Sequence, residues 1–190
     1  MKRILILRAC GSPDEPHECE SIMEQSKLYG MEPVSCEVNT NDELLSALRD
    51  NGQFDYIYLS AHGCADSFGN EDGGIDMAWQ KFAGELCGFD CMNDGCILML
   101  SCCRGGLMQV AHTLFRECGS ISYVMGPRQS LTSADMHICF GVFLYNAEVK
   151  KTDPVVACEK IKSATDQRFS CYDREEEELN AMCYAKLGIM

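Results

Sequence analysis

The sequence predicts an α/β fold in which a mostly parallel central sheet of about five to six strands lies between two layers of helices. Short runs rich in β-branched and aliphatic residues alternate along the chain with segments whose apolar residues recur at helical spacing. Nearly every position within most of these runs is apolar, which is typical of strands buried on both faces of a parallel sheet. Right-handed crossovers join such strands, so helices are expected on both faces.

Five runs are expected to form the main strands. They extend from Ile4 to Leu7, Val34 to Val38, Tyr56 to Leu59, Ile97 to Leu100 and Ile121 to Met125. A helix with a clear pattern follows the second run. Thr40 and Glu43 can form a capping box there, three leucines form one apolar stripe, and Gly52 can end the helix.

Five further helices are predicted. They begin near Asp76, Gly106, Thr132, Pro154 and Glu175. The first two of these show the i, i+3, i+4, i+7 spacing of a helix that packs by one face. Thr132 and Asp135 suit the start of a very apolar helix that continues to Tyr145, and a run of four glutamates suits the positive N-terminal end of the last helix.

The length and composition indicate one globular domain over residues 1–190. Apolar residues make up 46% and charged residues 24% of the chain, which excludes a wholly disordered or fibrous protein. The net charge of −13 disfavours nucleic acid and anionic membranes as partners and favours a basic peptide. The same charge also fits a protein whose acidity only keeps it in solution.

The chain contains 14 cysteines, but disulfide frameworks are usually found in short, secreted proteins. The apolar run before Arg8 spans only four residues, too short for a signal peptide or a membrane span, so a cytoplasmic protein with reduced thiols is expected. No CxxC pair is present, and Cys87, Cys91 and Cys96 are spaced irregularly, so neither a metal site nor a cofactor is predicted. Most cysteines are better explained as small buried apolar residues.

Two strand ends carry residues suited to catalysis. In a mostly parallel sheet, functional residues gather where the strands end at their carboxyl sides. His62 follows the third strand within DYIYLSAHGC, and Cys103 follows the fourth within ILMLSCCRGG. An imidazole can take the proton of a thiol, and the N-terminus of the helix expected near Gly106 favours a thiolate. His62 and Cys103 are therefore the predicted catalytic dyad.

Glycines follow both members of this dyad. Gly63 and Gly105 allow sharp turns and let a substrate approach the backbone closely. The backbone amides of Gly63 and Cys103 are expected to bind the oxyanion of a tetrahedral intermediate. No residue that orients His62 is assigned, because acidic residues in a hairpin loop are usually solvated. Three such residues follow His62: Asp66, Glu71 and Asp72.

The two strand ends resemble the caspase-like cysteine peptidases, above all the bacterial CHAT domains. The resemblance rests on the strand that leads to SAHG and the strand that leads to LSCCRG. It covers about residues 50–146, including the hairpin-and-helix insertion SFGNEDGGIDMAWQKFAGEL and the strand end VMGP, whereas residues 1–50 agree only in the order of elements.

The caspase signature Q-A-C-R-G matches S-C-C-R-G at Cys103, Arg104 and Gly105, with Cys102 in the alanine position. The dyad histidine, His62, lies 41 residues before Cys103, against about 50 in caspases. The resemblance thus implies that the second of the two adjacent cysteines is the nucleophile. It implies that the first is a small buried strand residue, and any further role of Cys102 is open.

The resemblance implies a cysteine endopeptidase that cleaves a protein or peptide within a bacterial regulatory or defence pathway, beside a regulatory partner protein. The signature glutamine helps caspases to select an acidic side chain, and Ser101 takes its place here. Aspartate specificity is therefore not implied, and the net charge favours a basic or neutral residue before the cut. Candidate substrate-binding residues are Ser101, Asp14 and Asp135.

Other functions remain open. A non-enzymatic signalling module would keep the same fold and bind a partner protein, and a thiol-dependent hydrolase or acyltransferase would act on a small molecule. The hypothesis of a redox sensor that uses Cys102 and Cys103 is weaker, because a disulfide between adjacent residues requires strained geometry. The other histidines compete poorly with His62. His17 lies in a proline-flanked segment read as a loop, His112 lies on the polar face of its helix, and His137 lies early in the apolar helix.

Overall fold

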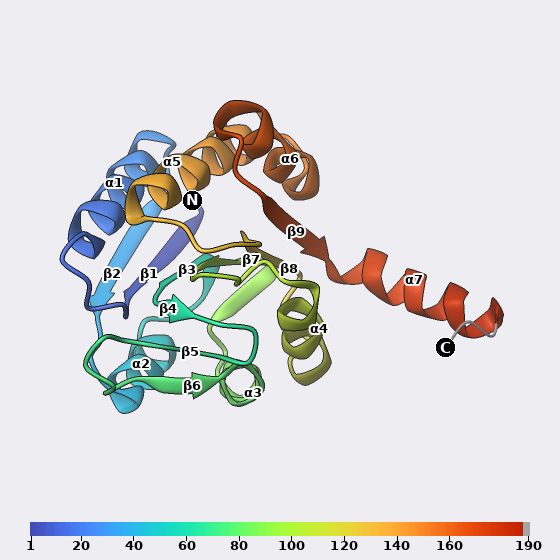
Figure 1. The fold of residues 1–190 in the computed structure, drawn as a ribbon, viewed down its shortest axis with the longest axis horizontal. Helices are drawn as coiled ribbons and strands as arrows, with labels where there is room; N and C mark the ends of the chain where they lie inside the picture. The colour runs from blue at the N-terminus through green and yellow to red at the C-terminus, as the bar shows by residue number, and fades with distance from the viewer. Residues whose placement is uncertain (188–190) are drawn as a thin grey trace.

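A computed structural model describes residues 1–187 as a three-layer α/β sandwich (Figure 1). Its central sheet has six strands in the order β2-β1-β3-β7-β8-β9, of which only β9 is antiparallel to its neighbour. The strand bounds are Arg3–Arg8 (β1), Glu32–Glu37 (β2), Phe54–Ser60 (β3), Met92–Ser101 (β7), Tyr123–Pro127 (β8) and Phe169–Asp173 (β9). The predicted mostly parallel sheet between helical layers is therefore confirmed.

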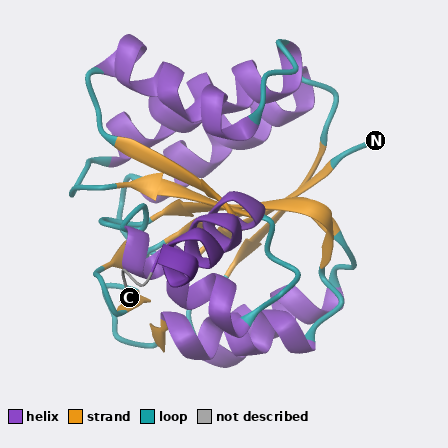
Figure 2. Cartoon of the chain, turned by 90° about the vertical axis from the view of Figure 1, so that its right-hand side faces the viewer, coloured by secondary structure: helices purple, strands orange, loops and turns teal. Residues whose placement is uncertain are grey.

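Helices cover both faces of this sheet (Figure 2). One layer contains α1 (Glu15–Leu28), α5 (Ser133–Leu144), the π-helical turn η1 (Tyr145–Val149) and α6 (Pro154–Thr165). The other contains α2 (Asn41–Asp50), α3 (Trp79–Gly88) and α4 (Met108–Glu117). Along β1, Ile4 and Ile6 pack against the first layer and Leu5 and Leu7 against the second. Because side chains alternate along a strand, an all-apolar run fills both cores.

The last helix, α7 (Arg174–Leu187), projects from the body of the protein beyond β9 (Figure 1). Arg174 anchors its first turn, because the guanidinium donates hydrogen bonds to the carbonyl oxygens of Ile121, Phe115 and Cys118. No helix in the described part of the chain is long and apolar enough to span a membrane.

Local signals for helix ends correspond to the observed caps. Thr132 and Asp135 form a capping box at α5, and the Asp153 side chain accepts hydrogen bonds from the first amides of α6. At α2, the Thr40 side chain accepts from the Glu43 amide, as expected. The Glu43 carboxylate, however, accepts from the Asn39 amide rather than from Thr40, so the predicted box is wrong in its second half.

The helix expected from Asp76 begins three residues later, at Trp79, because Asp76–Ala78 forms a strand (β6). This strand belongs to a small antiparallel sheet with β4 (His62–Gly63) and β5 (Ser67–Gly69). Phe68 on β5 packs against Trp79 and Phe82 with ring centroids 4.8 Å and 5.0 Å apart. This aromatic cluster fixes the small sheet against α3 at the carboxyl end of β3.

The segment around His17 is a helix, so its reading as a loop is wrong. Pro16 occupies the first turn of α1, where proline costs no hydrogen bond, and Glu15 and Glu18 lie near the positive N-terminus. Both glutamates are buried, so the face of α1 that meets the core looks polar in the sequence. His17 itself is exposed.

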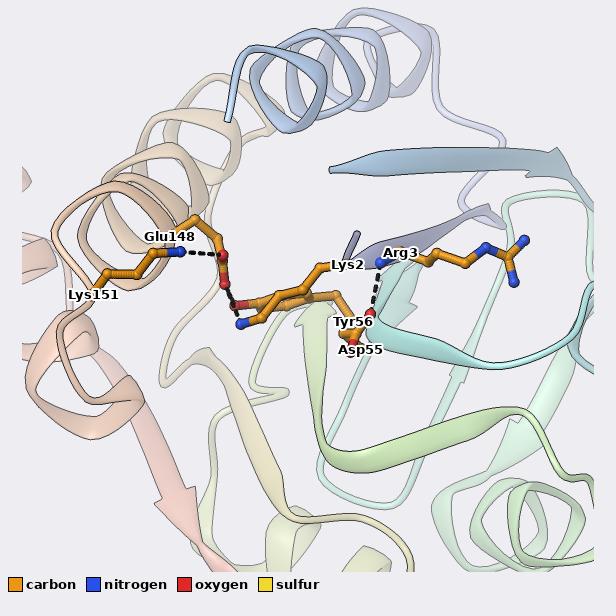
Figure 3. Close-up of polar contacts among 6 residues, drawn as sticks. All are labelled: Lys2, Arg3, Asp55, Tyr56, Glu148 and Lys151. Carbon is orange, nitrogen blue, oxygen red and sulfur yellow. Dashed lines mark hydrogen bonds and ion pairs between the residues drawn. The ribbon is translucent and has the colours of Figure 1, made fainter. Parts of the chain in front are cut away.

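At the opposite end of the sheet, a buried glutamate joins η1 to the strands (Figure 3). Lys2 and Lys151 donate hydrogen bonds to the Glu148 carboxylate at 2.6 Å and 3.3 Å, and the Tyr56 hydroxyl donates a third. Burial raises the pKa of Glu148, but the hydrogen bonds from Lys2 and Tyr56 and the charge of Lys2 outweigh burial, so the net pKa is lowered. The carboxylate is thus ionised and neutralised within the fold.

Candidate active site

The carboxyl ends of β3 and β7 lie side by side. The two strands pair in register up to Ser60 and Ser101, and the Ala61 amide donates a hydrogen bond to the Ser101 carbonyl at 3.2 Å. Beyond this point Gly63 lies directly against Cys102, since a Cβ at Gly63 would lie 2.7 Å from that of Cys102. Glycine is therefore required where the two strand ends meet.

His62 and Cys103, the predicted dyad, line one cavity of about 260 Å³ at this edge. The cavity lies among the ends of β1, β3 and β7, the first turn of α1 and the start of α5. Two of the predicted substrate-binding residues, Asp14 and Ser101, also line it. The third, Asp135, does not, because its carboxylate is engaged in the capping box of α5 and accepts a hydrogen bond from Gln167.

His62 is about half exposed, with 52% of its side-chain surface accessible. Its Nε2 atom lies 3.5 Å from Cys10 Sγ and 3.5 Å from Glu71 Oε1. The Glu71 amide donates to the Cys10 carbonyl, which fixes the hairpin loop against the loop after β1. In the tautomer in which Nε2 donates to Glu71, Nδ1 is the nitrogen that can accept a proton.

Cys103 is half-buried, and its Sγ atom lies 4.0 Å from the Leu131 carbonyl oxygen. The next residue, Arg104, has a φ of 65°, in the left-handed region that non-glycine residues rarely adopt. The turn cannot relax easily, because Gly106 contacts Gly126 so closely that a Cβ at Gly106 would lie 1.9 Å from the Gly126 oxygen. Strain of this kind is typical of functional turns.

The helix after Cys103 starts later than the sequence indicated. α4 begins at Met108, so a turn that includes the Gly105-to-Cys102 hydrogen bond separates Cys103 from its N-terminus. The field of a helix terminus falls off within one turn. The helix N-terminus therefore lies further from Cys103 than the sequence indicated.

The two residues of the predicted oxyanion hole differ in their surroundings: Cys103 lines the cavity, whereas Gly63 lines a neighbouring hollow that also includes His62. Among the described residues, the Cys103 amide donates no hydrogen bond. In the small sheet, Cys64 donates to Ser67 in the hairpin loop, so the adjacent pair of Gly63 and Phe68 is the non-hydrogen-bonded kind. The Gly63 amide therefore points away from β5. It lies on the strand that packs against Cys102 and Cys103.

Glu18 lies in the same cavity and was missed by the sequence analysis. It is only 4% exposed, and its Oε1 atom accepts hydrogen bonds from the Tyr58 hydroxyl at 2.7 Å and from Ser101 Oγ at 2.6 Å. Burial raises its pKa and nearby Glu15 adds to this, while the hydroxyls of Ser101, Tyr58 and Ser133 oppose it. Glu18 was not predicted because an acidic residue in a segment that contains prolines usually lies in a solvated loop.

The loop after β1 adds a second thiol to the cavity. Cys10 is 8% exposed and contacts His62, and its own amide donates to Glu15 Oε1 at 2.8 Å. Burial raises the pKa of Cys10, which disfavours the thiolate. Cys102 is fully buried, donates to the Leu59 carbonyl and has a strongly raised pKa, so it is a packed core residue, as expected.

The remaining histidines lie elsewhere. His112 lies 3.0 Å from Glu177 on α7, and His137 Nδ1 lies 3.4 Å from the Ser133 carbonyl oxygen. Within residues 1–187, no group of three or more His, Cys, Asp or Glu side chains is arranged to hold a metal ion. Comparisons with protein-family models and with curated proteins give no match to this chain.

Proposed function

We propose that the protein is a thiol-dependent hydrolase, and more specifically a cytoplasmic, caspase-like cysteine endopeptidase that needs no cofactor. The observation that carries the proposal is that His62 and Cys103, which follow neighbouring parallel strands, line one cavity, and that Gly63, the residue after His62, packs against Cys102. A nucleophile, a base and oxyanion donors in one concave site are the parts that acyl transfer requires.

In the proposed mechanism, Cys103 Sγ adds to the scissile carbonyl carbon while its proton passes to His62 Nδ1. The amides of Gly63 and Cys103 donate hydrogen bonds to the resulting oxyanion. When the C–N bond breaks, His62 returns the proton to the leaving amine. His62 then deprotonates a water that adds to the thioester, and the carboxylic acid leaves as the Cys103 thiol is restored.

Cys10 is the alternative nucleophile, because its sulfur is within hydrogen-bonding distance of His62. Two observations favour Cys103 instead. Burial raises the pKa of Cys10, whereas Cys103 is more accessible and directly precedes Arg104, the residue with the strained backbone. The Cys10 amide is also bound by Glu15, so it cannot serve as an oxyanion donor.

The test uses a mixed peptide library under reducing conditions, with cleavage read by mass spectrometry. Cys103→Ala is expected to lower turnover by more than about a thousandfold while the fold is retained. Cys10→Ala, the matched control, is expected to keep most of the activity. If Cys10→Ala loses activity and Cys103→Ala does not, Cys10 is the nucleophile and the assignment of Cys103 is wrong.

Labelling with a thiol-directed electrophile separates an enzyme from a silent signalling module. Cys64 is a confounder because it is exposed and hydrogen bonds from Ser67 lower its pKa. The exposed cysteines, Cys64, Cys87 and Cys183, are therefore first replaced by serine. Fast labelling at Cys103 that depends on His62 supports the enzyme. Slow and uniform labelling together with no cleavage supports the module.

A further inference from the structure

We propose that Glu18 makes this cavity selective for a cationic side chain, so that the protein cleaves after lysine or arginine. This inference rests on the proposed peptidase activity and names its substrate class. The carboxylate is nine-tenths buried and lies at the wall of the cavity that also contains Cys103. A substrate side chain that enters the cavity must therefore meet Glu18.

The position of Glu18 is built by three elements. It projects from the first turn of α1, and hydroxyls from β3 and β7 hold one of its oxygens. One of these donors, Ser101, lies two residues before Cys103 on the same chain segment. The carboxylate is thus tied directly to the strand that presents the nucleophile. A cation bound to it is held close to the scissile bond.

The charge around Glu18 is uncompensated. Within the described part of the chain, no lysine, arginine or histidine forms an ion pair with it. The cavity lining includes a second acid, Asp14, but neither lysine nor arginine. A buried carboxylate is costly without a partner. A lysine or arginine side chain would supply that partner, whereas an aspartate would be repelled.

The remaining walls fit the stem of a long basic side chain. Leu131 and Met136 give the cavity an apolar side on which methylene groups can pack. Its volume of about 260 Å³ is below the range of roughly 300–1,000 Å³ that is typical of sites for drug-sized ligands, so it suits one side chain. A side chain whose charged end binds Glu18 and whose apolar stem packs beside Met136 is a lysine or an arginine.

Paired peptides test the inference. They are identical except for the residue before the cut, which is lysine, arginine, aspartate or norleucine, the last being an uncharged analogue of lysine. The parent is expected to show a kcat/KM for lysine or arginine at least about tenfold above that for norleucine, with aspartate cleaved most slowly. Glu18→Gln is expected to lower the ratio of kcat/KM for lysine to that for norleucine to below about threefold.

Glutamine keeps the shape and an oxygen that can accept from Tyr58 and Ser101, so this variant is expected to fold. Glu148→Gln is the matched control, because it removes a buried glutamate that does not line the cavity and should leave the lysine preference intact. Equal cleavage after lysine and norleucine by the parent, or an unchanged preference in Glu18→Gln, would overturn the inference.

A binding measurement separates this inference from the proposed function. Agmatine, which is arginine without its carboxyl group, is titrated into parent, Glu18→Gln and Cys103→Ala proteins and followed by NMR. Binding by the parent and Cys103→Ala that weakens at least about tenfold in Glu18→Gln supports a cation site even if no peptide is cleaved. Cleavage without cation preference or agmatine binding leaves the peptidase standing and removes the role of Glu18.

Discussion

Two buried glutamates, one at each end of the same sheet, have opposite surroundings. Glu18 and Glu148 are 4% and 6% exposed, and each accepts a hydrogen bond from a tyrosine of β3. Those tyrosines, Tyr56 and Tyr58, are two residues apart and face the same helical layer. Glu148 also binds two lysines, whereas the hydrogen bonds to Glu18 in the described part of the chain come from hydroxyl groups.

The difference indicates which of the two carboxylates stabilises the fold. Glu148 is neutralised by Lys2 and Lys151 (Figure 3). Its ion pair with Lys2 connects η1 to the start of the chain, so this carboxylate has a structural role. Glu18 has no ion-pair partner among residues 1–187, lies at the wall of a cavity, and has a pKa that burial raises. A buried carboxylate without an internal cation is costly to keep. It is therefore the better candidate for binding something that is not part of the chain.

The largest expected effect that tests this comparison is on stability at pH 7. Glu148→Gln removes the charge that pairs with Lys2 and Lys151, and we expect it to lower the free energy of unfolding by about 1–2 kcal/mol. Glu18→Gln removes an unpaired buried charge and should leave stability unchanged or raise it. Thermal unfolding measures both, with a decrease in Tm of roughly 2–8 °C expected for Glu148→Gln. Destabilisation of the same size in both variants would contradict the contrast.

The free energy of unfolding should depend on pH in opposite ways through Glu148 and Glu18. Glu148 has a lowered pKa in the fold, so its contribution is present above the pKa of the unfolded chain and is lost as the pH falls through the folded value. Glu18 has a raised pKa, since burial and Glu15 outweigh the hydroxyls of Tyr58, Ser101 and Ser133. Its ionisation therefore costs stability as the pH rises through the unfolded value.

Denaturant titrations at a series of pH values from 4 to 8, on the parent and both glutamine variants, check this prediction. On acidification, the deficit of Glu148→Gln relative to the parent should shrink. The advantage of Glu18→Gln should also shrink, because the parent carboxyl becomes protonated. A Glu18→Gln advantage that grows on acidification would show that the native carboxylate is stabilised by a partner.

The sequence predicted the regular part of the fold and the dyad for one reason. Buried parallel strands consist of apolar runs, and His62 and Cys103 directly follow two of them. It did not predict α1, because the buried Glu15 and Glu18 interrupt the apolar pattern of its core-facing side. The half-buried strand β9 was missed because it lacks the all-apolar pattern of the central strands.

The rest of the candidate site depends on which strands are neighbours. Cys10 and Glu71 are far from Cys103 in the sequence, and only the pairing of β1 with β3 brings Cys10 to His62. The apolar pattern of a strand does not indicate which strands lie beside it, because each of the five runs could occupy several positions in a parallel sheet. The sequence could therefore bring His62 and Cys103 to the same edge of the sheet, but it could not predict the groups around them.

The smallest expected effect concerns Glu71, an exposed counterpart of the two buried glutamates. Its side chain is 48% exposed and lies 3.5 Å from His62 Nε2, so solvent screens its charge. Glu71→Ala should lower kcat by about three- to tenfold, because His62 loses a group that holds its ring, whereas Glu71→Gln should recover most of the activity through its amide oxygen. If glutamine fails to rescue, the charge of Glu71 matters despite its exposure, and burial alone does not decide which carboxylates act in this site.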